Sequence, residues 1–385
     1  MAIVLNIHWL EATIVSIMDD PASLSRRFTE ACDDTVPAGN LLESSTTVRL
    51  DLPHRLALSD ALLPLEGTVD AFCRLQTRVR AASFGDRLIR AESRFDALAL
   101  GTPASSADDL LRLLVLEASE EQPGPRAMRQ AANAVEALEH GLLTVHENGA
   151  SALTLGLLRD MHDRLCAGLD EPVALDETRQ STLVADPMLR DLERFLACSP
   201  ALPLPVRVAI VVALVECAQP FGSGNRQLAW LLPPMMMAAE GRLPLFLGQT
   251  LAAVLADYET ALDALRVRHD WEAWICFFLN RMTHAAEVAI DRLERLVSLQ
   301  QARELELLPL RSDSTARRLA ELVLGVPVLT VGTAQAMLGV SFQTANAAVA
   351  TLQKLGIVTP YSSNRRNRVF IVEGTLAMLA GAGQA

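Results

Sequence analysis

This sequence of 385 residues lacks closely spaced cysteines. Its six cysteines are scattered, and no two of them form a C-x-x-C pair. Most lie in apolar stretches that are typical of helices, where a thiol behaves as a small buried hydrophobe. We therefore expect reduced thiols rather than a disulfide framework, which indicates a cytoplasmic protein.

A hydrophobic run long enough to cross a membrane is also missing. The most apolar stretch is broken by Arg207 and Glu216, and it falls short of the ~20 residues that a span requires. Residues 1–20 have no lysine or arginine ahead of their apolar residues, unlike a secretory signal peptide. From the sequence we expect a soluble intracellular protein with no membrane partner.

Positive charge is in short supply. The 34 lysines and arginines are outnumbered by 46 acidic residues, which gives a formal net charge of -12. Such a surface repels the phosphates of nucleic acids, so we do not expect non-specific nucleic-acid binding over the whole molecule. A local basic patch can still bind them.

Runs of β-branched residues are scarce, whereas alanine and leucine dominate and half of all residues are hydrophobic. This composition predicts a mainly α protein with a substantial core. The length is sufficient for two or three domains.

The loop over residues 219–227 separates two apolar stretches, which predict helices over 205–218 and 227–239. Two glycines two residues apart, followed at once by a helix, leave backbone N–H groups free to converge on an anion. The alternative is a helix–helix connection that is kept for its turn geometry. The candidate nucleotide- or anion-binding residues are Gly222, Ser223, Gly224, Asn225 and Arg226.

The pattern changes near Pro309. It predicts a helix over 313–324, a strand over 328–330 and a helix over 333–338. A longer helix follows to residue 355, with Ser341 as its N-cap, and then strands at 357–359 and 368–372. This order is typical of a winged helix-turn-helix domain.

Several stretches, in the right order, resemble the Fic (Fido) proteins in their long form, which has a helical N-terminal region and a C-terminal winged helix. Residues 158–165 (LRDMHDRL) resemble the L-x-x-x-H-x-x-L helix early in the Fic core, and residues 191–196 (DLERFL) resemble the helix after its flap. Residues 270–279 (DWEAWICFFL) are similar to the run that closes the core, and residues 341–372 are similar to the winged helix. The resemblance covers roughly residues 65–378.

The resemblance implies a mainly α fold in four parts. Residues 1–65 form an N-terminal segment to which the pattern assigns no fold, and residues 66–150 form the helical N-terminal region. A Fic-like core follows over residues 151–308. The winged helix-turn-helix, a small α+β domain, occupies residues 309–385.

In Fic proteins the loop between the two central helices reads H-P-F-x-(D/E)-G-N-G-R-x-x-R. The resemblance implies transfer of AMP from ATP to a protein hydroxyl, with the histidine as general base, the acidic residue holding Mg²⁺ and the arginines binding phosphates. This chain has Gln219 in place of the histidine, Ser223 in place of the acidic residue and Trp230 in place of the second arginine. Arg226 replaces the second glycine, and Gln227 replaces the first arginine.

These replacements remove the chemistry of the loop. A glutamine amide has no basic lone pair near neutral pH, and general-base catalysis contributes ~10²–10⁴-fold. A neutral serine is a weak Mg²⁺ ligand, and tryptophan removes a bidentate phosphate donor. We therefore expect no catalytic residue and no metal site. No cofactor is expected either, since ATP and Mg²⁺ would be needed only by an active transferase.

Three other residues receive structural predictions. His162 is expected to pack as a structural histidine on its helix, because Leu158 and Leu165 share its face. In the predicted winged helix, Phe342 and Leu352 are expected in the core.

The second helix of the predicted winged helix offers the other candidate site. Its polar side chains are types that contact base edges or phosphates, and the wing over residues 362–368 is short, polar and basic. Protein interaction and structural support are the alternatives for this domain. The candidate DNA-binding residues are Gln343, Thr344, Asn346, Lys354, Arg365, Arg366 and Arg368.

Together these features predict a catalytically inactive Fic-like protein that acts as a DNA-binding or protein-interaction regulator through its winged helix. Two alternatives stay open: an active nucleotidyl or phosphoryl transferase with an atypical motif, and a nucleotide sensor that binds without chemistry. The partners considered are DNA, a protein, and a second copy of the chain in a homodimer.

Overall fold

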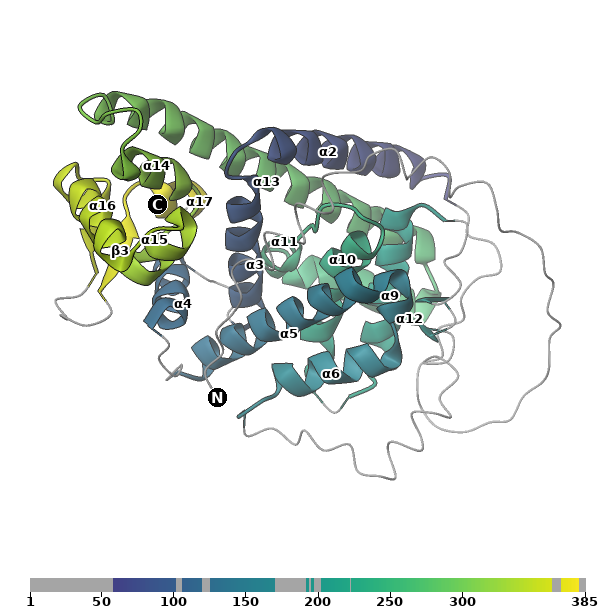
Figure 1. Cartoon of the computed structure of the whole chain (residues 1–385). Coiled ribbons are helices and arrows are strands. Elements are labelled where there is room, and N and C mark those ends of the chain that lie inside the picture. The colour runs from purple at the N-terminus through teal and green to yellow at the C-terminus, as the bar shows by residue number, and fades with distance from the viewer. Residues whose placement is uncertain are drawn as a thin grey trace.

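The structure is a computed structural model. It describes residues 58–101, 106–119, 125–169, 192–193, 195–196, 202–221, 223–361 and 368–380. Within these residues almost all regular structure is helical, with one small sheet, which confirms the mainly α class (Figure 1). Nearly all of the N-terminal segment lies outside the described residues, and so does the stretch 170–187, which has little periodicity and is predicted to be a surface loop or flap.

The helical region begins with α2 (Leu62–Ala81), α3 (Gly85–Gly101) and α4 (Ala107–Ser119). The sequence pattern predicts continuous helical spacing through α2 and α3, but the chain turns sharply between them. A side chain at Gly85 would place its Cβ 2.2 Å from the carbonyl oxygen of Val79. Glycine is therefore what allows this close approach.

The centre of the molecule is formed by α5 (Arg126–Asn148), α6 (Leu155–Leu165), α9 (Leu204–Ala218) and α10 (Asn225–Ala239), with the short 3-10 helix η1 (Gly149–Ala152) after α5. Helix α9 is buried on all sides over most of its length. Helix α10 contains Pro233 and Pro234, where the sequence predicts a kink or break. It stays helical through both prolines, which are buried among its neighbours, so packing holds the helix together.

The helical region is completed by α11 (Gly248–Ala252), α12 (Leu255–Arg268) and the long α13 (Trp271–Glu306). The apolar spacing over 247–268 predicts a single helix, but the chain breaks it between α11 and α12. Helix α2 lies along α13 at the top of the molecule in Figure 1. Among the contacts that join them, the buried Thr68 hydroxyl donates to the carbonyl oxygen of Leu279 over 3.0 Å.

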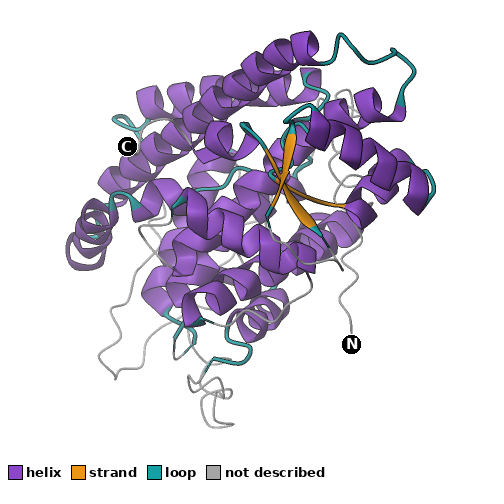
Figure 2. Ribbon diagram, turned by 90° about the vertical axis from the view of Figure 1, so that its left-hand side faces the viewer, coloured by secondary structure: helices purple, strands orange, loops and turns teal. Residues whose placement is uncertain are grey.

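The C-terminal unit, residues 309–380, contains α14 (Thr315–Leu322), β1 (Val328–Thr330), α15 (Val331–Leu338), α16 (Phe342–Lys354), β2 (Val358–Pro360), β3 (Val369–Val372) and α17 (Thr375–Ala380). The helices and strands up to β3 follow the predicted order. Strand β3 lies between β1 and β2 and is antiparallel to both (Figure 2). Ser341 is the N-cap of α16, as predicted, and accepts a hydrogen bond from the N–H of Thr344.

The C-terminal unit packs against the helical region and is hydrogen-bonded to it. Leu324 and Leu379 belong to the hydrophobic core of the helices, although the unit also has a core of its own. Arg87 of α3 donates to the carbonyl oxygen of Leu324 over 2.7 Å, and the buried Arg303 of α13 donates to the carbonyl oxygen of Glu373. The surface of α16 is thus held in a defined position on the molecule.

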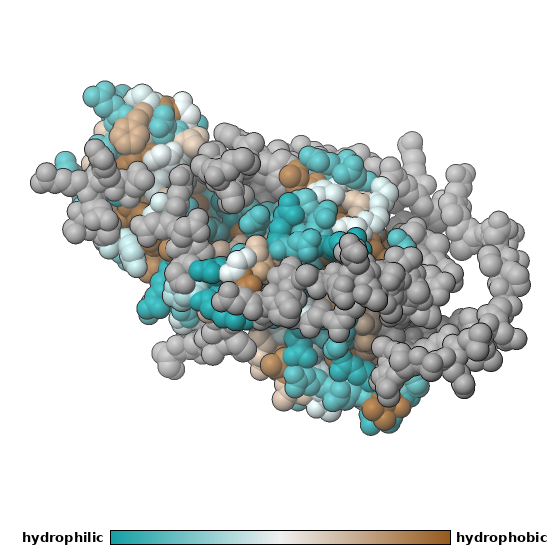
Figure 3. Space-filling view, turned by 90° about the horizontal axis from the view of Figure 1, so that it is seen from below, coloured by the Kyte–Doolittle hydropathy of each residue, from teal (hydrophilic) through white to brown (hydrophobic). Residues whose placement is uncertain are grey.

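The described part of the surface is mostly hydrophilic where Figure 3 shows it, with small scattered apolar patches. Among the residues described, no helix is both long enough and apolar enough to cross a membrane.

Candidate functional site

The loop after α9 begins with an unusual backbone conformation. Gln219, at the position of the catalytic histidine in the resembled motif, is exposed and has a φ of 43°, in the left-handed region that few residues other than glycine adopt. Gly224 has a φ of 74° and directly precedes α10. The described part of the loop therefore turns twice through left-handed geometry. Gly222 lies outside the described residues.

Asn225 closes the loop. Its Oδ1 accepts a hydrogen bond of 3.0 Å from the N–H of Phe221, and its Nδ2 donates one of 2.8 Å to the carbonyl oxygen of Phe221. Both ends of the amide thus serve the backbone of the loop itself. Asn225 therefore stabilises the conformation of the loop.

His162 of α6 packs against the same loop. Its ring is buried and lies parallel to that of Phe221, with the centroids 3.9 Å apart. Its Nε2 lies 2.9 Å from the carbonyl oxygen of Ser223, where it donates. A Cβ at Gly224 would lie 3.4 Å from the imidazole. The prediction of a packed histidine agrees with this burial, but helical spacing alone held no sign that the ring would contact the loop.

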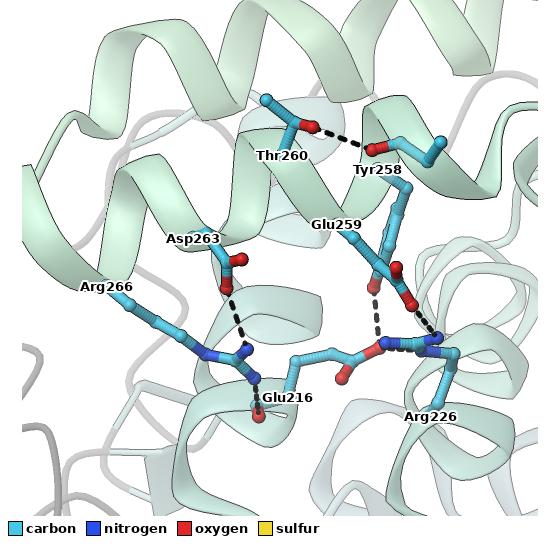
Figure 4. Close-up of polar contacts among 8 residues, drawn as sticks. Glu216, Arg226, Tyr258, Glu259, Thr260, Asp263 and Arg266 are labelled. Carbon is cyan, nitrogen blue, oxygen red and sulfur yellow. Dashed lines mark hydrogen bonds and ion pairs between the residues drawn. The ribbon is translucent and has the colours of Figure 1, made fainter.

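Glu216 is the centre of a polar network that joins α9, α10 and α12 (Figure 4). Its side chain is only 3% exposed. Its Oε1 accepts a hydrogen bond of 2.8 Å from the hydroxyl of Tyr258 and one of 3.2 Å from Nε of Arg226. Arg226 also donates from Nη1 to Glu259 over 3.0 Å. Nothing in the sequence pattern singles out Glu216, Tyr258 or Glu259 for this role.

The network neutralises the one cation of the loop. Burial lowers the pKa of Arg226, but the charge of Glu216 and the hydrogen bonds to Glu259 and Glu216 outweigh it and raise the pKa above its ordinary value. Burial, followed by the charge of Glu216, holds the pKa of Tyr258 well above its ordinary value, so the hydroxyl keeps its proton and donates. The guanidinium is therefore directed at two carboxylates within the protein.

Trp230 belongs to the core. Its indole is 3% exposed and meets the ring of Tyr258 edge-on, with the centroids 5.5 Å apart. Tyr258 packs in the same manner against Trp274, whose Nε1 donates to the carbonyl oxygen of Ala209 over 2.8 Å. An aromatic cluster thus stands where the resembled motif has its second arginine.

Metal-binding groups are not gathered at the loop. Within the part of the chain that the structure describes, no cluster of three or more His, Cys, Asp or Glu side chains could hold a metal ion. The hydroxyl of Ser223, at the position of the acidic residue in the resembled motif, is buried and has no hydrogen-bond partner among the described residues.

The predicted DNA-binding residues are partly brought together. Gln343, Thr344 and Lys354 are exposed on α16, and Asn346 is half-buried. Arg368, at the start of β3, donates to Oδ1 of Asn346 over 2.7 Å. Arg365 and Arg366 lie outside the described residues.

The two core predictions for this helix have different outcomes. Leu352 is fully buried, as predicted. Phe342 is 59% exposed, so its prediction as a core residue is wrong. It has the same helical phase as the buried Ala345 and Val349, but it is the first residue of α16 and projects past the end of that core.

Comparisons with known proteins found similarity in solved structures alone. No protein-family model matches the chain, and the search of curated proteins found no match. A Fic family protein from Desulfovibrio desulfuricans is 16% identical, with a TM-score of 0.48 over 84% of this chain and 99% of that one. A Fic-1 fragment from C. elegans is 16% identical, with a TM-score of 0.47 over 61% of this chain and 73% of that one.

A third structure, a Fic domain containing signaling protein from Bacteroides thetaiotaomicron, is 12% identical, with a TM-score of 0.45 over 60% of this chain and 97% of that one. All three carry the name of the family that the sequence motifs resemble. With identities and TM-scores this low, the function proposed below depends on the residues of the chain itself.

Proposed function

We propose that this chain is a Fic-like protein without AMP-transferase activity, and that its C-terminal unit is a winged helix that binds DNA. The sequence motifs around residues 158–165, 191–196 and 270–279 support the family. The loop supports the loss of activity, and the surface of α16 supports DNA binding.

The observation that carries the loss of activity is the position of Arg226. A loop that binds the phosphates of ATP needs its cation free to reach them. Here the guanidinium is committed to Glu216 and Glu259, and releasing it would leave the buried Glu216 without its cationic partner. An uncompensated buried carboxylate is costly, on the order of 3–5 kcal/mol. Gln219 adds an independent obstacle, because it cannot take a proton from the attacking hydroxyl.

Transfer of label from α-labelled ATP in the presence of Mg²⁺ tests this proposal. We expect no labelled protein from the wild-type chain, either on itself or on proteins of a cell extract, and none from Gln219→Ala. Label transfer by the wild type that Gln219→Ala abolishes would show an active transferase. Calorimetry with ATP, ADP and AMP tests the alternative of a nucleotide sensor, for which we expect no heat of binding.

The distribution of charge favours DNA over a protein as the partner of α16. Residues 309–385 hold seven arginines and lysines against three acidic residues, a net charge of +4. Residues 1–308 carry the balance of -16. Phosphates are therefore repelled by most of the molecule and attracted to one end.

Gel-shift titrations at increasing salt test DNA binding. We expect affinity that falls with salt, and we expect it to fall further when Arg365, Arg366 and Arg368 all become alanine. Replacing Arg311 is the control, since its side chain is 86% exposed in the same unit and it precedes α14 in the chain, outside both α16 and residues 362–368. Binding that ignores the triple change, or no binding even at low salt, would contradict the proposal.

A further inference from the structure

Phe342 is a large apolar side chain that the fold leaves exposed. It is exposed at the first turn of α16, the helix that the proposed function assigns to DNA. Its neighbours Gln343 and Thr344 are exposed as well. Exposing a phenyl ring to water is unfavourable, and burying that apolar surface in a complex is favourable.

Polar and cationic side chains lie along the same helix as Phe342 and next to it in the C-terminal unit. Asn346 lies one helical turn further on. Arg368, the residue directly before β3, donates a hydrogen bond to Oδ1 of Asn346. Lys354, the single lysine of the whole chain, is exposed at the last turn of the same helix. An exposed aromatic ring on a unit that carries a net charge of +4 matches a partner that combines phosphates with a few apolar groups.

The middle of the helix permits a close approach. Gln343, Ala347, Ala350 and Lys354 follow one another at spacings of three and four residues, and all four are exposed. The two alanines leave no bulk between the ends of this stripe. A major groove can therefore receive the helix near its backbone, with the first turn at the base edges and Lys354 at a phosphate.

We propose that α16 reads thymine, with the ring of Phe342 packed against the C5-methyl group of a thymine in the major groove. The inference rests on the proposed DNA binding and adds a base to it. The thymine methyl is the one apolar group that a base pair presents in this groove, and phenylalanine is among the side chains that contact it. First-turn residues of a recognition helix are those that reach base edges.

The test removes the methyl group alone. Wild-type chain first selects a binding site from a random pool of DNA duplexes, and each thymine of that site is then replaced by deoxyuridine in turn. We expect at least one replacement to weaken wild-type binding about fourfold, the equivalent of one lost methyl contact. The same replacement should leave the affinity of Phe342→Ala unchanged, because the ring that senses the methyl is gone.

Two further variants make the result specific. Leu305→Ala removes a residue that is 72% exposed near the end of α13, and it should keep the full response to deoxyuridine. Phe342→Leu keeps an apolar side chain at this position and should keep part of the response to deoxyuridine. Thermal unfolding of each variant confirms folding, since a residue as exposed as Phe342 contributes little to stability.

Three results would overturn the proposal, and they can be told apart. Indifference of the wild type to every deoxyuridine would contradict the methyl contact while leaving DNA binding intact. An equal loss in wild type and Phe342→Ala would assign the methyl contact to another residue. Absence of any selected or salt-dependent binding would contradict the proposed function itself.

Discussion

Replacing Asp96 with asparagine should remove a pH dependence from the stability of this protein. Asp96 is buried in α3, and its Oδ1 accepts a hydrogen bond from the N–H of Gly248 at the start of α11. Glu92, one turn earlier on α3, is buried too and pairs with Arg292 of α13. Arg292 is thus paired with Glu92 and acts on Asp96 through its charge alone. The second oxygen of Asp96 has no hydrogen-bond partner among the described residues.

The magnitude follows from the pKa of this carboxyl. Burial is the largest cause that raises the pKa of Asp96 from 3.8 to about 7, and the charge of Glu92 adds to it. The hydrogen bonds from the backbone of Gly248 and Gln249 and the charge of Arg292 act in the opposite direction. At ~1.4 kcal/mol for each pKa unit, ionising this group costs the folded protein on the order of 4 kcal/mol.

The sign follows from proton binding. The folded state holds the proton of Asp96 more tightly than the unfolded state does, so the free energy of unfolding falls as the pH rises from about 4 to about 7. Above the folded pKa the loss is complete. Asparagine keeps an oxygen for the N–H of Gly248 and carries no charge at any pH, so Asp96→Asn should be more stable than the wild type at pH 8.

The free energy of unfolding of the wild type and of Asp96→Asn is measured by guanidinium unfolding, followed by tryptophan fluorescence, at several pH values between about 5 and 8. Asp70→Asn is the matched control, because Asp70 is exposed on α2 and its ion pair with Arg74 lies at the surface. We expect the control to keep the slope of the wild type. A wild-type stability that is flat over this range, or an unchanged slope in Asp96→Asn, would refute the reasoning.

Two pairs of substitutions test the packing and the polar network by the same unfolding assay. Gly248→Ala should destabilise by ~1–3 kcal/mol, because its Cβ would lie 2.7 Å from Oδ1 of Asp96. Gly67→Ala should stabilise by ~0.5–1 kcal/mol, because nothing lies within 4 Å of a Cβ there and alanine suits α2 better. Glu216→Gln should cost ~1.5–3 kcal/mol, because it removes the buried carboxylate that accepts from both Arg226 and the hydroxyl of Tyr258. Glu259→Gln, on the exposed side of the same arginine, should cost less than ~1 kcal/mol. Equal effects within either pair would contradict the burial that separates its members.

Local sequence patterns were sufficient for much of the fold. Helices α9, α10 and α16 begin and end nearly where the apolar spacing predicts, because helix formation and capping depend on neighbouring residues. The same patterns missed the breaks between α2 and α3 and between α11 and α12. At Gly85 the break depends on contact with Val79 across the turn, which spacing alone does not reveal.

The sequence by itself determined which acid–base groups the loop after α9 offers. A glutamine at position 219 cannot act as a base in any fold, since basicity belongs to the side chain and not to its surroundings. Only the tertiary structure decided what the other residues there do. Arg226 could equally well face a phosphate or a carboxylate until the fold brought Glu216 and Glu259 beside it. Phe342 likewise follows the apolar phase of its helix and is left exposed only because the core ends before it.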